Sequence, residues 1–401
     1  MGNCLVAQSG GPSSVINATI AGVVKANQLN PLYTKVYCGL HGIEGILKEQ
    51  LVDLTTMSTY ENRILRQTPA SALGSCRYKL KRDNIEDFEK LFAILAKYDI
   101  DTLFYTGGND SMDTVYALSE YAEKNGISNR RFVGCPKTVD NDLVVTDHCP
   151  GYGSAAKFIN NTVNTTWLDY NVYTRQEVFI TETMGRDAGW LAASACVSGK
   201  VDILLLPEVP FEKEIFLARV ADIVGATNKC YIVVSEGVRY PDGQYLAAGD
   251  AKNDGFGHAI LGGAGNALRS LILDNKVAAR AKVQDLSTAQ RCAIHCQSLT
   301  DVNESFNLGL SAHMRSTDHN FTGKMVALIR RKQEEYDVDY IAVAASEVAN
   351  KVKAFPRQWI LPNLAGITPE ATAYIRPLIV GEPTMLYRDG VPEYVDPYYQ
   401  R

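Results

Sequence analysis

Short apolar runs alternate with longer segments of helical periodicity over roughly the first 240 residues of the chain. The runs rich in β-branched and aromatic residues are expected to be strands, and they lie at 4–7, 102–105, 131–133, 178–181, 203–206 and 231–234. The segments expected to be helices lie at 15–26, 112–125, 190–197 and 212–226. Such alternation is typical of parallel sheets covered by helices, so we expect an α/β protein with doubly wound parallel sheets.

Three polar loops follow predicted strands, namely 9–12 (SGGP), 107–111 (GGNDS) and 136–142 (PKTVDND). Open parallel sheets bind their ligands beyond the carboxyl ends of the strands. We therefore expect the three loops to converge on one rim of a sheet and to carry the chemistry of the protein.

The first two of these loops have the features of phosphate and metal sites. Gly10 and Gly11 let backbone amides approach an anion at a helix start, although an ordinary tight turn is the favoured interpretation of this loop taken alone. The GGNDS loop offers amides for phosphate and Asn109 or Asp110 for magnesium. Asn, Asp and Ser are also the preferred caps of a helix, which is the alternative reading.

The PKTVDND loop places an ammonium and two carboxylates within six residues. Lys137, Asp140 and Asp142 suit phosphoryl transfer, with a cation for the donor, a base, and a carboxylate near metal. The alternative is a solvated charged turn, but three such loops after three strands argue against that alternative. Arg186, in the segment MGRDAGW, is either a phosphate ligand or an exposed residue at a capped helix start.

Composition and charge narrow the ligand class. The chain has 401 residues, of which 46% are hydrophobic and 21% charged, and its net charge is −5. This composition suits two globular domains, and without a basic field we expect a small ligand, no nucleic acid and no membrane partner. The nine cysteines are scattered and never spaced Cys-x-x-Cys, and no segment resembles a signal peptide or a membrane span. We therefore expect reduced thiols and a cytoplasmic protein.

Three further motifs are weaker. Cys292, His295 and Cys296 lack a second pair with zinc-ligand spacing, so we expect a buried strand there. Residues 151–156 (GYGSAA) match a dinucleotide pattern but follow Pro150 rather than a strand, which argues against nicotinamide binding. The glycine-rich stretch 255–265 is expected to be a mobile loop before a helix.

Taken in order, these segments resemble the phosphofructokinase family. The matching elements are SGG at 9–11, LGSCR at 73–77, GGNDS at 107–111, PKTVDND at 136–142, ETMGRDAGW at 182–190 and SEG at 235–237. The resemblance implies two doubly wound α/β domains with the active site in the cleft between them. It assigns 1–145 with about 299–360 to the phosphoryl donor, and 146–298 with about 361–401 to a sugar phosphate.

The resemblance also implies a reaction, the Mg²⁺-dependent phosphorylation of the carbon-1 hydroxyl of fructose 6-phosphate. Asp140 would be the base, and Asp142 would assist the base or the metal. Arg77 would bridge the donor and acceptor phosphates, and Gly11 would lie against the donor. The sugar phosphate would contact Thr138, Asp140, Met184, Gly185, Arg186, Glu236 and Arg291.

Two positions indicate the donor. ATP-using members of the family have glycine where this chain has Asp110 and Lys137. The Asp110 carboxylate would occupy and repel the region of a nucleotide's α-phosphate, while the Lys137 ammonium would neutralise pyrophosphate. A unit-charge contact at about 4 Å is worth roughly 4 kcal/mol at an effective dielectric of about 20, before desolvation. We therefore expect pyrophosphate as the donor and a reversible reaction that serves glycolysis and gluconeogenesis.

The chain departs from the family pattern at three places. Asn109 stands where most members carry an aspartate toward magnesium, so metal ligation passes to Asp110, Asp142 or water. The family's sugar-phosphate arginine from a neighbouring subunit aligns with Glu177, and Arg175 lies two residues earlier on the same face of a strand. After Arg291, the family's usual His and Gln-Arg ending is missing.

Two alternatives stay open from the sequence. One is an ATP-dependent 6-phosphofructokinase, or a kinase for a related sugar phosphate such as sedoheptulose 7-phosphate. The other is a non-catalytic regulatory subunit that binds sugar phosphates, against which Asp140, Lys137 and Arg77 argue. Family sites built across subunits imply a homodimer or a homotetramer.

Overall fold

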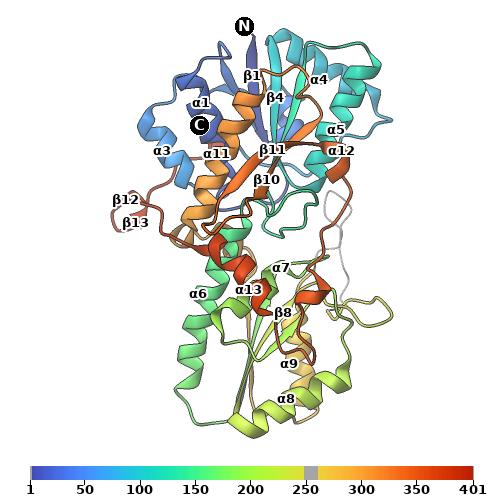
Figure 1. Ribbon diagram of the computed structural model, residues 1–401, viewed down its shortest axis with the longest axis vertical. Helices are drawn as coiled ribbons and strands as arrows, with labels where there is room; N and C mark the ends of the chain where they lie inside the picture. The colour runs from blue at the N-terminus through green and yellow to red at the C-terminus, as the bar shows by residue number, and fades with distance from the viewer. Residues whose placement is uncertain (1, 248–260, 401) are drawn as a thin grey trace.

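The computed structural model describes residues 2–247 and 261–400. Figure 1 shows two α/β units stacked along the long axis of the molecule, with the N-terminal strands in the upper unit. The α/β class with doubly wound parallel sheets, expected from the alternating pattern, is confirmed.

The upper unit is built on a seven-stranded sheet with the strand order β11-β10-β5-β4-β1-β2-β3. Its strands are β1 (Asn3–Gln8), β2 (Val36–Gly39), β3 (Leu51–Asp53), β4 (Ile100–Gly107), β5 (Arg131–Pro136), β10 (Lys324–Arg330) and β11 (Val338–Ala344). The strands from β10 to β2 run parallel, and only the edge strands β3 and β11 are antiparallel to their neighbours. Since β2 and β4 flank β1 on opposite sides, the winding reverses between β1 and β4, and such a switch point is where ligands bind.

Helices cover both faces of this sheet because the side chains of each strand alternate between them. In β1, Cys4 and Val6 pack on one side, while Leu5 and Ala7 pack on the other. The first side is covered by α1 (Ile16–Leu29), α3 (Thr59–Gln67) and α11 (Leu299–Arg315). The second side is covered by α2 (Gly42–Ile46), α4 (Ile85–Lys97), α5 (Asn109–Lys124) and α12 (Ala345–Val348).

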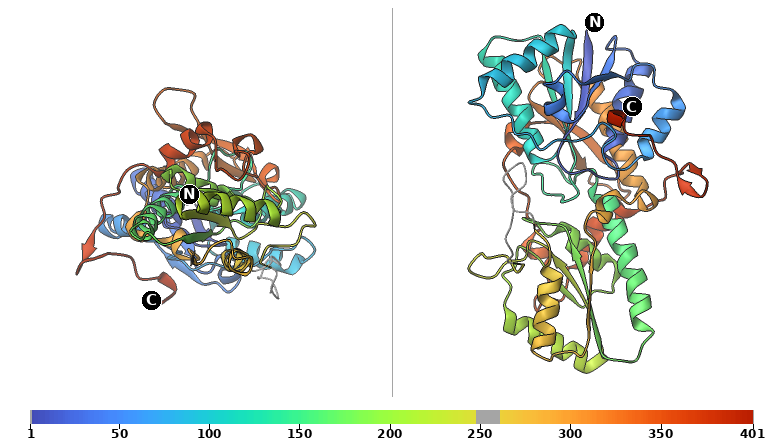
Figure 2. Two further views of the ribbon diagram at one scale, coloured as in Figure 1. Left: turned by 90° about the horizontal axis from the view of Figure 1, so that it is seen from below. Right: turned by 180° about the vertical axis from the view of Figure 1, so that it is seen from behind.

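The lower unit is built on a four-stranded parallel sheet with the order β7-β8-β6-β9. Its strands are β6 (Glu177–Thr183), β7 (Ile203–Leu205), β8 (Lys229–Ser235) and β9 (Ala281–Asp285). One face packs against α6 (Tyr152–Asn171), α7 (Trp190–Ser194) and α13 (Pro369–Ile375), and the other against α8 (Lys213–Thr227) and α9 (Ala264–Asp274). Both views in Figure 2, like Figure 1, show α6 on the flank of this unit, and it extends from the junction of the two units.

Short elements complete the chain. They are α10 (Ala289–Cys292), the hairpin of β12 (Tyr387–Arg388) and β13 (Val391–Pro392), and the 3₁₀ helices η1 (Ala195–Ser198), η2 (Ile294–Cys296), η3 (Arg357–Trp359), η4 (Arg376–Ile379) and η5 (Tyr398–Gln400). No helix among the residues described is long and apolar enough to span a membrane.

Two expectations need correction, and one lies outside the described residues. The buried strand expected around Cys292 and Cys296 is wrong, because the chain there turns through α10 and η2 toward α11 and finds no neighbouring strand. The tail after 361 follows the second sheet only in part, since Val395 and Tyr398 return to the core of the first. Most of the glycine-rich stretch 255–265 lies outside the described residues, and α9 begins at Ala264.

Candidate functional site

A cavity of about 670 Å³ lies where the strand ends of the two sheets face each other. The upper sheet contributes the loops after β1, β4 and β5, and the lower sheet contributes those after β6, β8 and β9. Of the residues expected to form the site, the cavity is lined by Gly11, Arg77, Asn109, Asp110, Lys137, Thr138, Asp140, Asp142, Met184, Arg186, Glu236 and Arg291. Gly185 is absent from the lining because it is buried behind Glu236.

Lys137 lies at the junction of the first two loops. Its side chain is buried, its ammonium donates to the carbonyl oxygen of Gly11, and its backbone N–H donates to Gly107 O at 2.9 Å. Burial lowers the pKa of this ammonium to about 8, although Asp140 raises it. Gly10 has φ 75°, a left-handed conformation that suits glycine and brings the backbone beside this cation.

Asp110 lies in the first turn of α5, where its carboxylate faces the positive end of the helix dipole. Its Oδ1 is 3.7 Å from Nζ of Lys79, which lies outside the cavity on the same side as Arg77. The hydroxyls of Ser9 and Ser111 meet at 2.5 Å and join the loops after β1 and β4. Asp110 and Lys137 thus line the same cavity, the carboxylate at the start of α5 and the ammonium between the first two loops.

Asp140 and Asp142 flank a tight turn at Asn141, which has φ 55° and is fully buried. The Asp140 N–H donates to Thr138 Oγ1 at 3.2 Å, while its buried Oδ1 accepts no hydrogen bond from the described residues. Burial raises the pKa of Asp140, against the cations of Arg186, Lys137 and Arg291, and burial together with Asp140 raises the pKa of Asp142 to about 7. Asp140 therefore lines the cavity with a carboxylate of raised pKa, one oxygen of which is buried and accepts no hydrogen bond from the described residues.

The lower wall of the cavity is built around Gly185 and Glu236. The Gly185 N–H donates to Glu236 Oε1 at 3.2 Å, and with φ 127° a side chain at 185 would strike Ser235 Oγ and Ala188 O at 2.7 Å. Burial raises the pKa of Glu236 to about 7, with a contribution from Asp140. The wall thus places a second poised carboxyl group opposite Asp140.

Two arginines bring positive charge to this wall. Arg186 pairs with Asp187 at 2.7 Å, and Arg291 approaches from α10 with a buried Nε that has no partner among the described residues. The motif-based reasoning missed Asp187, Asp285, Ser287 and Thr288, which also line the cavity. Only Asp187 carried a signal, since it directly follows Arg186 in a recognised motif.

Arg175 does not reach this cavity. It lies before β6, at the end of the strand away from Met184, where its Nε is 3.3 Å from the buried Glu177 carboxylate. Within one chain it therefore cannot stand in for a sugar-phosphate arginine.

Asn109 has partners that its expected metal role did not foresee. Its side-chain amide donates to the carbonyl of Lys351, and its oxygen accepts the N–H of Asn350. Both ends of the amide thus bind this backbone, the metal role of Asn109 stays a prediction, and Asp110 and Asp142 are the nearby carboxylates. No group of three or more His, Cys, Asp and Glu residues with ligand geometry occurs in the described ranges, so the zinc alternative at Cys292 finds no support.

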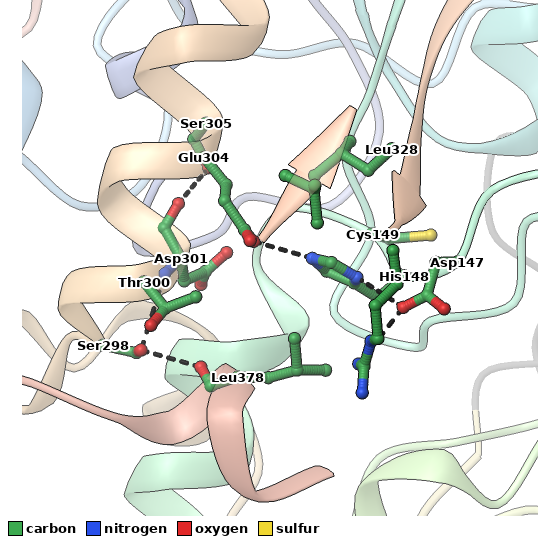
Figure 3. A network of polar contacts seen from close by, with 12 residues as sticks. Asp147, His148, Cys149, Ser298, Thr300, Asp301, Glu304, Ser305, Leu328 and Leu378 are labelled. Carbon is green, nitrogen blue, oxygen red and sulfur yellow. Dashed lines mark hydrogen bonds and ion pairs between the residues drawn. The ribbon is translucent and has the colours of Figure 1, made fainter. Parts of the chain in front are cut away.

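A buried polar network supports the chain just after Asp142 (Figure 3). His148 lies between Asp147, at 2.9 Å from Nδ1, and Glu304 of α11, at 2.7 Å from Nε2. The two carboxylates raise the pKa of His148 to about 9 in spite of its burial. The Tyr336 hydroxyl donates to Glu304 at 2.6 Å. The network connects the chain that follows Asp142 to α11 and to the first sheet.

Comparisons with known proteins agree with this geometry. The phosphofructokinase family profile matches residues 3–313. The chain is 38% identical over 402 residues to the pyrophosphate--fructose 6-phosphate 1-phosphotransferase of Halomonas elongata, covering 98% of this chain and 95% of that protein. It is 38% identical over 403 residues to the protein of the same name from Methylococcus capsulatus, with the same coverages. The crystal structure of the pyrophosphate-dependent phosphofructokinase from Nitrosospira multiformis matches with a TM-score of 0.89 at 34% identity, covering 98% of this chain and 96% of that one.

Proposed function

The chain belongs to the phosphofructokinase family, and we infer that it is a pyrophosphate-dependent 6-phosphofructokinase. It transfers a phosphoryl group from pyrophosphate to the carbon-1 hydroxyl of fructose 6-phosphate and releases phosphate and fructose 1,6-bisphosphate. The reaction runs in both directions because the phosphoanhydride bond of pyrophosphate and the phosphate ester that forms have similar free energies of hydrolysis. The observation that carries the donor assignment is the buried Lys137 ammonium beside Gly11, with Asp110 on the same cavity wall.

The residues of the cavity divide the chemistry between them. We propose that the Asp140 carboxylate takes the proton from the acceptor hydroxyl as the hydroxyl oxygen bonds to the terminal phosphorus of pyrophosphate. As the bridging P–O bond breaks, the charge that develops on the leaving phosphate is neutralised by Lys137 and Arg77. The sugar phosphate is held by Thr138, next to Asp140, and by Glu236, Met184, Arg186 and Arg291 on the opposite wall.

Magnesium fits this site as a metal held mainly by substrate. Mg²⁺ is commonly bound by one or two carboxylates together with substrate phosphates, and Asp110 and Asp142 supply two carboxylates on the donor side. When bound, the ion would neutralise charge on the phosphates of the donor.

The division of labour follows the two sheets. We propose that the upper unit binds the donor and the lower unit binds the sugar phosphate, each with its own strand-end loops. We also propose a cytoplasmic homodimer or homotetramer, a location that the nine free cysteines support because reduced thiols suit a reducing compartment. Light scattering of the purified protein would reveal a monomer and so refute the oligomer.

The direct test is an assay of fructose 1,6-bisphosphate formation with pyrophosphate or ATP as donor. We expect turnover with pyrophosphate and a much lower kcat/KM with ATP, and a preference for ATP would refute the donor assignment. Asp140→Asn should lower kcat by about 10²–10⁴-fold, the usual worth of a positioned base. Asp169→Asn is the matched control because Asp169 is exposed on α6 and lies outside the cavity.

A further inference from the structure

A segment far along the chain lies directly behind the catalytic turn. Residues 350–355, here called the strap, follow α12 and run between the two units. The Lys353 N–H donates to the carbonyl oxygen of Asp142 at 2.7 Å. On its other side, the Lys353 carbonyl accepts the indole N–H of Trp190, from α7, at 2.8 Å. The backbone of one residue, Lys353, therefore joins the catalytic turn to the lower unit.

The side chain of Lys353 extends this attachment. Its ammonium donates to the carbonyls of Asp147 at 2.8 Å and Thr146 at 3.2 Å, and it reaches Asn141 Oδ1 at 3.5 Å. These three oxygens use the three donors of an ammonium group, and all belong to the chain from 141 to 147. The Nζ atom also lies 5.1 Å from the ring centroid of Trp190. All three donors of the Lys353 ammonium thus bind residues 141–147, and Lys353 is not among the residues that line the cavity.

Both ends of the strap are fastened to other parts of the site. At one end, the Asn109 amide binds the backbone of residues 350–351, and Asn350 Nδ2 donates to Asp113 at 3.2 Å. At the other end, the Phe355 N–H donates to Glu208 Oε1 at 2.7 Å, and the same oxygen accepts the Gly189 N–H at 2.9 Å. The strap therefore connects the donor loop, the catalytic turn and the start of α7.

We propose that Lys353 is a positioning residue for phosphoryl transfer, which acts by holding the turn at Asn141 so that Asp140 faces the acceptor hydroxyl. The turn benefits from support, because Asn141 has φ 55°, a left-handed conformation that asparagine adopts more readily than other non-glycine residues but still at some energetic cost. The proposal rests on the proposed function, since it takes Asp140 as the base. Lys353 touches no reacting atom and sets only where the reacting carboxylate lies.

The test compares Lys353→Met, Lys353→Arg and Lys351→Met in the purified full-length enzyme, with pyrophosphate and fructose 6-phosphate as substrates. Lys353→Met should lower kcat by about 10–100-fold, because misplacement by about 1 Å costs on that order, and both KM values should change little. Lys353→Arg should recover most of the kcat, since it keeps a cation with several donors. Lys351→Met should match the wild type, because the Lys351 side chain is exposed and the substitution keeps its carbonyl.

Each outcome bears on one proposal. A folded Lys353→Met variant with wild-type kcat, or with a changed KM alone, would overturn the positioning role. If Lys353→Met melts below the assay temperature, the comparison of Lys353→Arg with the uncharged Lys353→Gln decides instead. A folded Lys353→Arg variant whose kcat is no higher than that of Lys353→Gln would also overturn the positioning role. A wild-type enzyme inactive with pyrophosphate would instead refute the proposed function. Circular dichroism and a melting curve for every variant separate lost activity from lost structure.

Discussion

Replacing Lys137 by methionine should make the protein more stable at neutral pH while removing its use of pyrophosphate. The ammonium is buried at the wall of the cavity, in the proposed donor site, and burial lowers its pKa from an ordinary 10.5 to about 8. Its folded-state pKa is therefore below the unfolded one, so the charged form opposes folding. The penalty is complete below pH 8 and disappears as the pH rises through 10.5.

The size of the effect follows from the pKa change. One pKa unit corresponds to about 1.4 kcal/mol, so the charged Lys137 costs roughly 3 kcal/mol at pH 7. Methionine fills similar space without the charge but loses the hydrogen bond to Gly11, which is worth about 1 kcal/mol. The net gain of Lys137→Met is then about 2 kcal/mol at pH 7. By pH 10 the cost of the lysine falls below about 1 kcal/mol, and the gain vanishes.

The assay is a pair of thermal melts, at pH 7 and pH 10, of the wild type and Lys137→Met. A gain of about 2 kcal/mol corresponds to a few degrees in Tm for a chain of this size. Pyrophosphate should raise the Tm of the wild type and leave that of Lys137→Met nearly unchanged, because binding stabilises only a competent site. A variant that melts lower than the wild type at pH 7, or that shows the same difference at both pH values, would refute this reasoning.

Three further outcomes are expected. Asp110→Gly combined with Lys137→Gly should shift the ratio of kcat/KM values from pyrophosphate toward ATP, and an unchanged ratio in donor assays would refute the donor roles. His148 has a folded pKa of about 9 against an ordinary 6.5, so its contribution to stability is complete below pH 6.5 and is lost as pH rises through 9. His148→Gln should therefore melt lower than the wild type at pH 6.5 by several degrees, with little difference at pH 10, and parallel Tm-pH curves would contradict this. Asn109→Asp should lower kcat about 10-fold, because it places a carboxylate against the Lys351 carbonyl. An unchanged kcat would show that the Asn109 amide has no role in holding the strap.

The fold and the upper half of the site could be predicted because they rest on local pattern. The central strands β1, β4 and β5 are short apolar runs that the sequence predicted, and the loops that carry Gly11, Asp110 and Asp140 directly follow them, whereas β2, β3, β10 and β11 were not predicted. Parallel strands bring such loops together by topology alone. Residues 285–291 were harder to predict, because after β9 the chain is irregular and Ser287 and Thr288 have no recognisable spacing.

Lys353 lay beyond prediction for another reason. It bonds to Asn141 across 212 positions of sequence, from a tail in which no period or motif marks the residues that matter. A lysine between Val352 and Ala354, two residues after another lysine, carries no sequence signal for a structural role, and only its three oxygen partners reveal one. Contacts of such range depend on the packing of the two units, which no local pattern encodes.

Asn109 combines a predictable position with unpredictable partners. Its position belongs to the GGNDS motif, while its hydrogen-bond partners belong to the strap. An aspartate there could accept the Asn350 N–H but could not donate to the Lys351 carbonyl, so only the amide satisfies both backbone groups. A metal-side carboxylate is then missing at 109, and Asp110 is the neighbouring residue that can supply it. In the proposed site, the same Asp110 also disfavours a nucleotide donor. One amide in place of a carboxylate is thus consistent with the two proposals that the strap holds the catalytic turn and that Asp110 serves both metal binding and donor selection.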